Sequence, residues 1–165
     1  ESWASLSVMK TAEDIVGDTK IDANGNTVEA GYIARPTDQR VNFSMFFQDY
    51  IPGKPKYKMH LNLIYGTGLP FGPPNGEKHQ DILRIPNYRR VDIGFSAVLK
   101  AADKKSKLEW LNTFNSVWLS AEVFNLLDIN NTISYLWVAD VSGREYAVPN
   151  YLTARQLNAK LIFTF

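Results

Sequence analysis

Residues 155–165 read Arg-Gln-Leu-Asn-Ala-Lys-Leu-Ile-Phe-Thr-Phe and alternate apolar with polar side chains up to the last residue. Side chains of a β-strand point alternately to opposite faces of a sheet, so a period of two indicates a strand with one apolar face. That face would consist of Leu157, Ala159, Leu161, Phe163 and Phe165. Only Ile162 breaks the pattern. We therefore expect an all-β fold in which this segment is the last strand.

The same alternation recurs upstream. Four segments repeat it clearly and one near the amino terminus repeats it more weakly; they are residues 40–49, 57–65, 90–100, 117–124 and 3–9. Together with the terminal segment they give six expected antiparallel, up-and-down strands. Alternating strands occur both in soluble β-proteins with one solvated face and in barrels that cross a membrane.

Composition decides little between these two classes. The 165 residues are 45% apolar and carry a formal net charge of +1, which fits one domain with a core and gives no reason to expect a nucleic-acid partner. The chain has no cysteine, which excludes a disulfide framework and a cysteine-rich metal site. No apolar run approaches the roughly 18 residues of a membrane helix, but barrel strands alternate and never form such a run.

The placement of charge favours a transmembrane barrel. The apolar faces are nearly free of charge, and the charged strand residues fall on the opposite face, where we expect them to line a wet lumen: Lys58, His60, Arg90, Asp92, Glu122 and Lys160. Tyrosine and tryptophan mark strand ends, as they do at membrane interfaces. Asp92 and Glu122 are the last candidates for hydrolysis, but ion pairing within the wall is the simpler interpretation, and we predict no enzymatic activity.

The connections alternate in length. A tight turn at 51–56 and a moderate connection at 101–116 contrast with long stretches at 11–39, 66–89 and 125–154. Outer-membrane barrels have their short turns in the periplasm and their long loops outside the cell. Loop aromatics are candidates for contact with an apolar or sugar-like ligand, although packing of strand extensions explains them as well: Phe71, Tyr88, Tyr135, Trp137, Tyr146 and Tyr151.

Two motif-like strings are predicted to be turns or loops. Residues 22–26 begin like a calcium loop but lack its glycine and glutamate, so we predict a turn at Asn24-Gly25. Residues 66–68 begin like a dinucleotide loop but lack the third glycine and the helix, so we predict an irregular exposed loop over 66–74. No cofactor is expected.

Three further segments also have simple interpretations. Glu77, His79 and Asp81 are suitable metal ligands, yet a solvated polar loop accounts for them and no metal is predicted. The lysines of 104–107 are interpreted as solvated charge. Residues 134–148 are predicted to form an exposed hairpin with Ser142-Gly143 in its turn.

Three segments carry a resemblance to a known family: Arg-Pro-Thr-Asp-Gln-Arg-Val-Asn-Phe at 35–43, Ala-Glu-Val-Phe-Asn-Leu-Leu-Asp at 121–128, and the ending at 152–165. Essentially the whole chain resembles the carboxyl-terminal barrel segment of TonB-dependent outer-membrane receptors of the Bacteroidetes type. The resemblance implies a 22-stranded barrel in the outer membrane of a Gram-negative bacterium and active uptake of a nutrient. It also implies that Leu161, Phe163 and Phe165 belong to the signal read by the barrel-assembly machinery.

The chain departs from this family by absence. Six strands are about a quarter of such a barrel, and even the smallest transmembrane barrels have about eight. The family's plug, the segment that contacts the energy-coupling protein and a secretory signal are all missing, so we expect residues 1–165 to be the carboxyl-terminal part of one barrel domain. The resemblance then implies these partners: outer-membrane lipid, the rest of the barrel and its plug, a TonB-type energy-coupling complex, the assembly machinery and, as an open question, a surface lipoprotein.

Two other function classes stay open. One is a small outer-membrane barrel that acts as an adhesin or a structural anchor, against which an upstream plug domain would argue. The other is a soluble lipocalin-like barrel that binds a ligand, which solubility without detergent would favour. The charge-free face from Val41 to Phe47 predicts the opposite behaviour in water.

Overall fold

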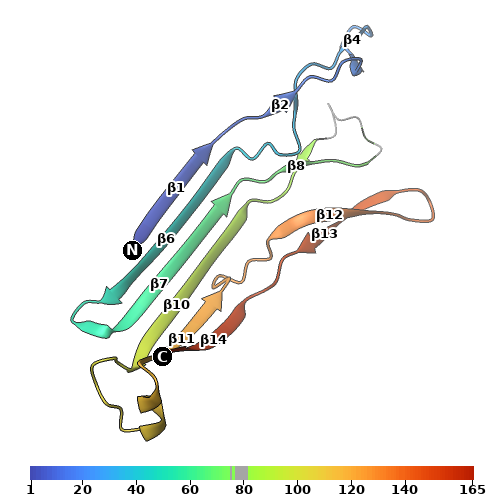
Figure 1. The fold of residues 1–165 in the computed structure, drawn as a ribbon. Helices are drawn as coiled ribbons and strands as arrows, with labels where there is room; N and C mark the ends of the chain where they lie inside the picture. Colours follow the sequence, from blue (N-terminus) through green and yellow to red (C-terminus); the bar gives the residue numbers. More distant parts are fainter. Residues whose placement is uncertain (75, 77–81) are drawn as a thin grey trace.

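The computed structural model describes residues 1–74, 76 and 82–165, and its main element is a six-stranded antiparallel sheet (Figure 1). The order along the sheet is β1 (Ser2–Val8), β6 (Val41–Ile51), β7 (Lys54–Gly66), β10 (Tyr88–Lys100), β11 (Ser116–Phe124) and β14 (Gln156–Thr164). These are the six expected strands, and the described residues form an all-β fold. None of the helices in this part of the chain is long and apolar enough to span a membrane.

Strand pairing joins the separate apolar faces into one surface. Phe47 of β6 lies opposite Leu61 of β7, Leu61 lies opposite Ile93 of β10, and the row continues through Val123 to Leu157 of β14. A slip of one residue would turn every side chain of a strand to the other face. The agreement between pattern and pairing across all six strands therefore specifies the register.

Burial on the two faces is the reverse of that in a water-soluble sheet. On the polar face, Asp92, Ser120 and Glu122 are only 5%, 3% and 7% exposed. On the apolar face, Phe95 is 44% exposed and Leu161 is 52% exposed. Large contiguous apolar surfaces are rare on soluble monomers, so another surface is needed to cover this face.

The connections differ in length at the two ends of the sheet (Figure 1). At the short-connection end, Gly53 (φ 72°) makes the turn between β6 and β7, and residues 101–115 contain the 3-10 helix η1 (Glu109–Thr113). At the long-connection end, four two-stranded sheets form from β2 (Ala12–Glu13), β3 (Thr19–Ile21), β4 (Thr27–Glu29), β5 (Ile33–Ala34), β8 (Pro70–Phe71), β9 (Leu83–Arg84), β12 (Thr132–Ala139) and β13 (Glu145–Tyr151). The expected alternation of short and long connections is confirmed.

Both predicted turns are present. Gly25 has a φ of 84° in the turn between β3 and β4, where Asp22 accepts backbone N–H groups of Asn24 and Asn26, each at 2.8 Å. Gly143 has a φ of 78° in the turn of the β12–β13 hairpin. Positive φ is nearly free of strain only for glycine, which explains both positions.

Within the described residues the sheet is open. β1 pairs only with β6, and β14 pairs only with β11, so each has one unpaired edge. Unpaired edges of long strands are templates for pairing with further strands. No closed barrel is formed by this part of the chain.

Two expectations are corrected. The loop over 66–74 is not simply irregular and exposed, because Gly66 and Gly68 are buried and β8 pairs with β9. A Cβ on Gly68 would lie 1.5 Å from the carbonyl oxygen of Ile85, so the two backbone segments approach too closely for any side chain. The second correction concerns the end of β10. Strict alternation over residues 90–100 places Lys100 on the polar face, but a bulge after Val98 pairs Lys100 with Val117 of the apolar face.

Candidate functional site

The polar face carries a row of side chains that four strands bring to one level. Gly94 of β10 lies opposite His60 of β7 and opposite Glu122 of β11. Glu122 in turn lies opposite Asn158 of β14, and Lys160 lies two residues further along β14. Residues far apart in the sequence thus meet because of register alone.

Glu122 is the centre of the first cluster. Lys160 Nζ donates to Glu122 Oε1 at 2.6 Å, Asn158 Nδ2 donates to Oε2 at 2.9 Å, and His60 Nε2 lies 3.9 Å from Oε1. A Cβ on Gly94 would lie 2.0 Å from His60 Cε1, so glycine leaves the space that the imidazole ring occupies between its neighbours. The Glu122 side chain is 8% exposed and that of Lys160 is 48% exposed, so the carboxylate is enclosed while the ammonium reaches the open side.

Asp92 is the centre of a second cluster on the same face. Arg90 Nε donates to Asp92 Oδ1 at 2.7 Å, the backbone N–H of Asn125 donates to the same oxygen at 2.9 Å, and Asn62 Nδ2 lies 3.4 Å from Oδ2. The Arg90 guanidinium also lies over the ring of Phe124, at 5.6 Å from its centroid. Each Asp92 oxygen therefore has a donor, which is what burial of a carboxylate requires.

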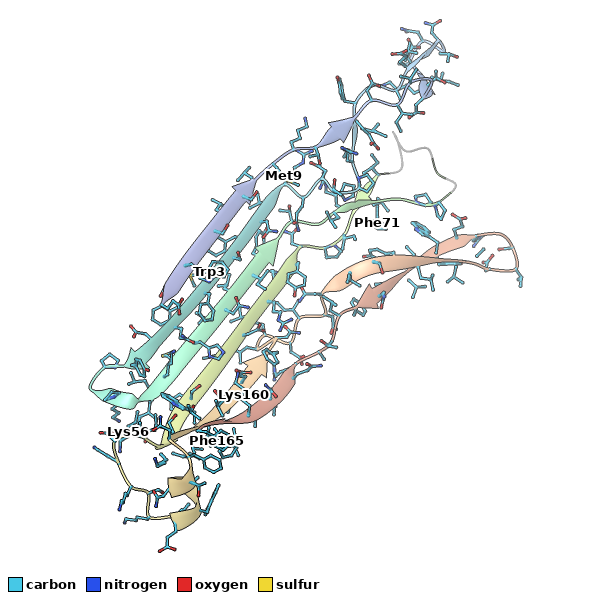
Figure 2. All side chains as sticks on the ribbon, in the orientation of Figure 1. Trp3, Met9, Lys56, Phe71, Lys160 and Phe165 are labelled. Atoms are coloured by element: carbon cyan, nitrogen blue, oxygen red, sulfur yellow. The ribbon has the colours of Figure 1, made fainter. Side chains whose placement is uncertain are left out.

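An open hollow of about 370 Å³ lies on this face. Four of the six predicted lumen residues line it, namely Lys58, His60, Glu122 and Lys160, and Lys160 is labelled in Figure 2. Arg90 and Asp92 do not line it. The hollow offers both signs of charge, hydroxyl groups and the ring of Trp118, so it is suited to polar contacts. Both carboxylates are engaged by donors, and the described residues contain no group of three or more His, Asp or Glu that could hold a metal.

Three of the six predicted loop aromatics meet at the long-connection end. The ring of Phe71 stacks on Tyr135 with centroids 4.3 Å apart and an interplanar angle of 8°, and Trp137 lies 6.3 Å from Phe71. These rings join the 66–88 connection to the β12–β13 hairpin. The other three do not join them: Tyr88 begins β10, Tyr146 OH lies 3.4 Å from Asp140 Oδ2, and Tyr151 is exposed.

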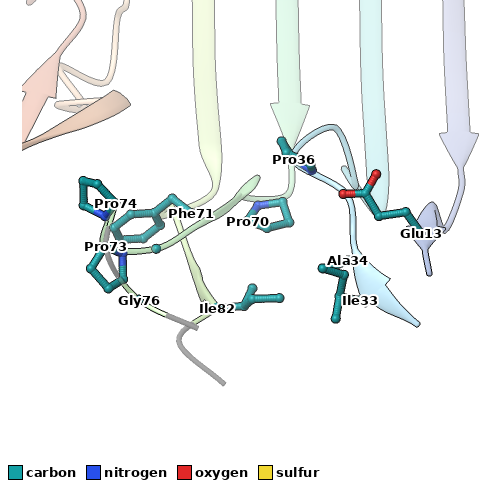
Figure 3. A pocket seen from close by; sticks show the side chains of 11 residues that line it. Glu13, Ile33, Ala34, Pro36, Pro70, Phe71, Pro73, Pro74, Gly76 and Ile82 are labelled. Carbon is teal, nitrogen blue, oxygen red and sulfur yellow. The ribbon is translucent and has the colours of Figure 1, made fainter. Parts of the chain in front are cut away.

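Beside Phe71 lies a small apolar pocket of about 260 Å³ (Figure 3). Its walls come from the 66–88 connection, from β2 and from β5 with the residues that follow it, and they include Ile33, Ala34, Pro36, Pro70, Phe71, Pro73, Pro74 and Ile82. Glu13 is the only charged residue among the described lining residues, and its carboxylate lies 3.3 Å from Arg35 Nε. The pocket is therefore suited to a small apolar group.

Sequence reasoning missed Asp38, which is completely buried at the long-connection end. It accepts the backbone N–H of Thr11 at 2.8 Å, Arg40 Nε at 2.7 Å and the guanidinium of Arg84. The Thr11 N–H and then the two guanidinium groups hold the pKa of Asp38 well below its usual range. Asp38 thus ties the 9–40 and 66–88 connections together, and only its position within the 35–43 motif marked it in the sequence.

Asn125 and Asn131 were also missed, and both complete the backbone at the end of the sheet where β10 begins and β11 ends. Asn125 adopts a φ of 52° and exchanges two side-chain hydrogen bonds with the backbone of Ile129, at 3.0 and 3.2 Å. Asn131 Oδ1 accepts the N–H of Arg89 at 2.9 Å, and its Nδ2 donates to the Arg89 carbonyl at 2.8 Å. The amide of Asn131 therefore replaces a strand residue.

The three residues of the predicted assembly signal lie on the edge strand β14 or directly after it. Leu161 pairs with Leu119, while Phe163 and Phe165 contact Phe114, with ring centroids 4.8 and 5.2 Å apart. Their role in assembly stays a prediction.

Glu77, His79 and Asp81 lie outside the described residues. None of the protein-family models, curated proteins or solved structures compared with the chain matches it.

Proposed function

We propose that the chain is part of the wall of an outer-membrane β-barrel receptor of TonB-dependent type, which takes up a nutrient across the outer membrane. The observation that carries this proposal is the inverted burial of the six-stranded sheet. Asp92 and Glu122 are enclosed by partners on one face, while Phe95 and Leu161 are exposed on the other. A lipid-facing exterior and a wet interior require this arrangement.

The sheet edges support the same proposal. β1 and β14 have unpaired edges and run antiparallel to each other, so further strands can continue the sheet from both sides without changing its up-and-down order. In the proposed barrel the remaining strands come from the rest of the receptor, and a plug fills the lumen. The polar hollow around His60 and Lys160 then faces the plug or the passing ligand.

The long connections are the proposed outer surface. Phe71, Tyr135 and Trp137 form one aromatic cluster there, and the apolar pocket lies beside Phe71. Aromatic faces and an apolar pocket suit an apolar or sugar-like part of a ligand. The chain contributes wall, lumen charge and outer loops, with no chemical reaction of its own, and the energy-coupling complex acts through other parts of the receptor.

Labelling of adjacent cysteines tests the membrane orientation, because the chain has no cysteine of its own. Phe95→Cys places a thiol on the apolar face of β10, and Ser96→Cys places one on the polar face. In outer membranes that contain the full-length protein, a water-soluble maleimide should label Ser96→Cys and should reach Phe95→Cys only after denaturation. A protein that stays in aqueous solution and never enters the membrane would instead identify a soluble barrel, whichever thiol is labelled.

Receptor function needs a separate test. Full-length protein is crosslinked in living cells, and covalent adducts with the inner-membrane energy-coupling protein are sought. Such adducts are expected from a TonB-dependent receptor. A barrel that labels as proposed but never forms them is a passive pore, an adhesin or an anchor.

A further inference from the structure

The connection between β10 and β11, residues 101–115, folds onto the apolar face of the sheet. Phe114 contacts Phe163 and Phe165, and Phe163 belongs to the apolar face because it pairs with Val117. Leu111 and Val117 are buried there, at 2% and 0% exposure. The connection is therefore fixed at the short-connection end, on the side of the sheet that the proposed function assigns to lipid.

Two large apolar side chains of this connection remain uncovered. Leu108 is 55% exposed and Trp110 is 58% exposed, although Leu111 of the same turn is buried. Trp110 meets Phe114 edge-on, with centroids 6.4 Å apart and an interplanar angle of 86°. Its ring therefore extends the group of rings formed by Phe114, Phe163 and Phe165. Tryptophan concentrates at membrane interfaces because its ring is apolar while its N–H needs a polar partner.

Five lysines lie at the same end of the sheet as these apolar groups. Residues 101–115 contain Lys104, Lys105 and Lys107, and the start of β7 at the same end of the sheet contributes Lys54 and Lys56, the latter labelled in Figure 2. All five are exposed, and none forms an ion pair within the part of the chain that the structure describes. The same two segments contain only two carboxylates, Asp103 and Glu109.

We propose that residues 101–115 form an interfacial site for anionic phospholipid. Leu108 and Trp110 enter the boundary of the acyl chains, and Lys104, Lys105 and Lys107 bind headgroup phosphates. The long stem of lysine can lie along apolar surface while its ammonium reaches the phosphate layer. A lipid is selected over a free phosphate or an acidic protein, because only a lipid offers an acyl region directly beside its phosphate.

The inference rests on the proposed function, since it requires a bilayer against the apolar face. It adds a lipid preference, which the barrel wall alone does not imply. A lysine near an anionic membrane surface gains about 1 kcal/mol, which corresponds to ~5-fold in binding. We therefore expect a preference of at least ~5-fold for an anionic lipid over a zwitterionic one when the three lysines act together.

The test uses the full-length protein in vesicles of phosphatidylcholine, with spin-labelled phosphatidylglycerol or spin-labelled phosphatidylcholine as the probe. The immobilised fraction of each probe measures the lipid that contacts the protein. The triple variant Lys104→Gln, Lys105→Gln, Lys107→Gln should lose the preference for phosphatidylglycerol. The charge-preserving variant with arginine at all three positions should retain it. The control Lys10→Gln, Lys20→Gln removes two charges at the long-connection end and should leave the preference unchanged.

The outcomes separate the two proposals. If the wild type immobilises both lipids without preference, or if the glutamine and arginine variants keep the same preference, the lipid site is wrong while the barrel stands. If the wild type immobilises neither lipid and remains in solution, the proposed membrane function fails and takes the lipid site with it. A preference lost on adding salt supports the site, because surface ion pairing is screened.

Discussion

The strands of the six-stranded sheet are held by long ladders of backbone pairs, whereas the long connections are held together by a few single side chains. In the sheet, every residue of β11 from Ser116 to Phe124 has a partner in β14. At the long-connection end, Asp38 helps to join the 9–40 and 66–88 connections, and Phe71 joins the 66–88 connection to the β12–β13 hairpin by ring stacking. Repetition therefore orders the sheet, and individual contacts order the connections.

The largest expected effect comes from a charge on the apolar face. Met45 and Ser44 are neighbours in β6 that point to opposite faces, with Met45 opposite Leu63 and Ser44 opposite Ile64. If the proposed barrel is correct, Met45→Lys should destabilise the folded full-length protein in lipid vesicles by ~2–4 kcal/mol, the cost of a basic side chain near the bilayer midplane. Urea titration followed by heat-dependent gel mobility measures this loss.

Ser44→Lys is the control, because its side chain would lie on the polar face, which faces the wet interior of the proposed barrel. It should change stability by less than ~1 kcal/mol. If Ser44→Lys were the more damaging of the two, the assignment of the faces would be reversed.

The next effect is confined to one connection. Gly68→Ala forces a Cβ against the Ile85 backbone and should weaken the β8–β9 pair by ~1–3 kcal/mol, as overpacking does. Hydrogen exchange of residues 68–71 and 83–85 reports the opening of that pair. Gly66→Ala is the matched control, since its Cβ would meet only the movable amide of Gln39, at 2.6 Å, and exchange should rise less. Equal exchange in both variants would contradict the tight backbone approach at Gly68.

Asp38 should make the stability of the long connections depend on pH in the acid range, whereas backbone pairing in the sheet does not depend on this carboxylate. Its folded pKa lies below the unfolded value of 3.8, so its stabilising contribution is present above that pH and is lost as the pH falls through the folded pKa. In the wild type, hydrogen exchange of residues 9–40, corrected for intrinsic rates, should rise at acid pH. Asp38→Asn should show faster exchange already at neutral pH and little further acid dependence.

Asp22 supplies the control for this experiment. The backbone N–H of Asn26 lowers its pKa as well, but Asp22 binds only its own turn. Asp22→Asn should therefore change exchange within residues 19–29 and leave Thr11 protected.

The smallest effect concerns the aromatic cluster of Phe71, Tyr135 and Trp137. Phe71→Leu keeps an apolar side chain but removes the stack on Tyr135, and it should loosen the β12–β13 hairpin by ~0.5–1.5 kcal/mol. Exchange of residues 132–139 measures the change. Tyr151 lies in the same hairpin but has no ring contact among the described residues. The exchange of residues 132–139 in Tyr151→Leu should therefore match that of the wild type. If both substitutions changed the exchange of residues 132–139 equally, the stack of Phe71 on Tyr135 would not stabilise the hairpin.

The same contrast explains what could be predicted from the sequence. A period of two reveals strands and faces, so alternation alone is enough to place the strands around Leu61, Ile93 and Val123. Pairing then brings Glu122 and Lys160 together almost automatically, because both lie on the polar face of strands that become neighbours.

The connections have no such period. The partners of Asp38 include Thr11 and Arg84, which lie 27 and 46 positions away in the sequence, and no local pattern links them. Gly68 has the sequence context of a turn former, although its actual role is to allow a close backbone approach. The bulge that moves Lys100 to the other face likewise depends on the geometry of the pair with β11, which alternation cannot encode.

The side chain of Asn131 has a consequence for how such a protein can diversify. Its amide forms hydrogen bonds with both the N–H and the carbonyl of Arg89, which a residue of a neighbouring strand would otherwise satisfy. The β12–β13 hairpin can therefore leave the sheet at this point without leaving these two backbone groups unpaired. The length of that hairpin is thereby uncoupled from the strand register below it. Insertions and deletions between residues 132 and 151 can change the surface at the long-connection end in evolution while the sheet keeps its pairing.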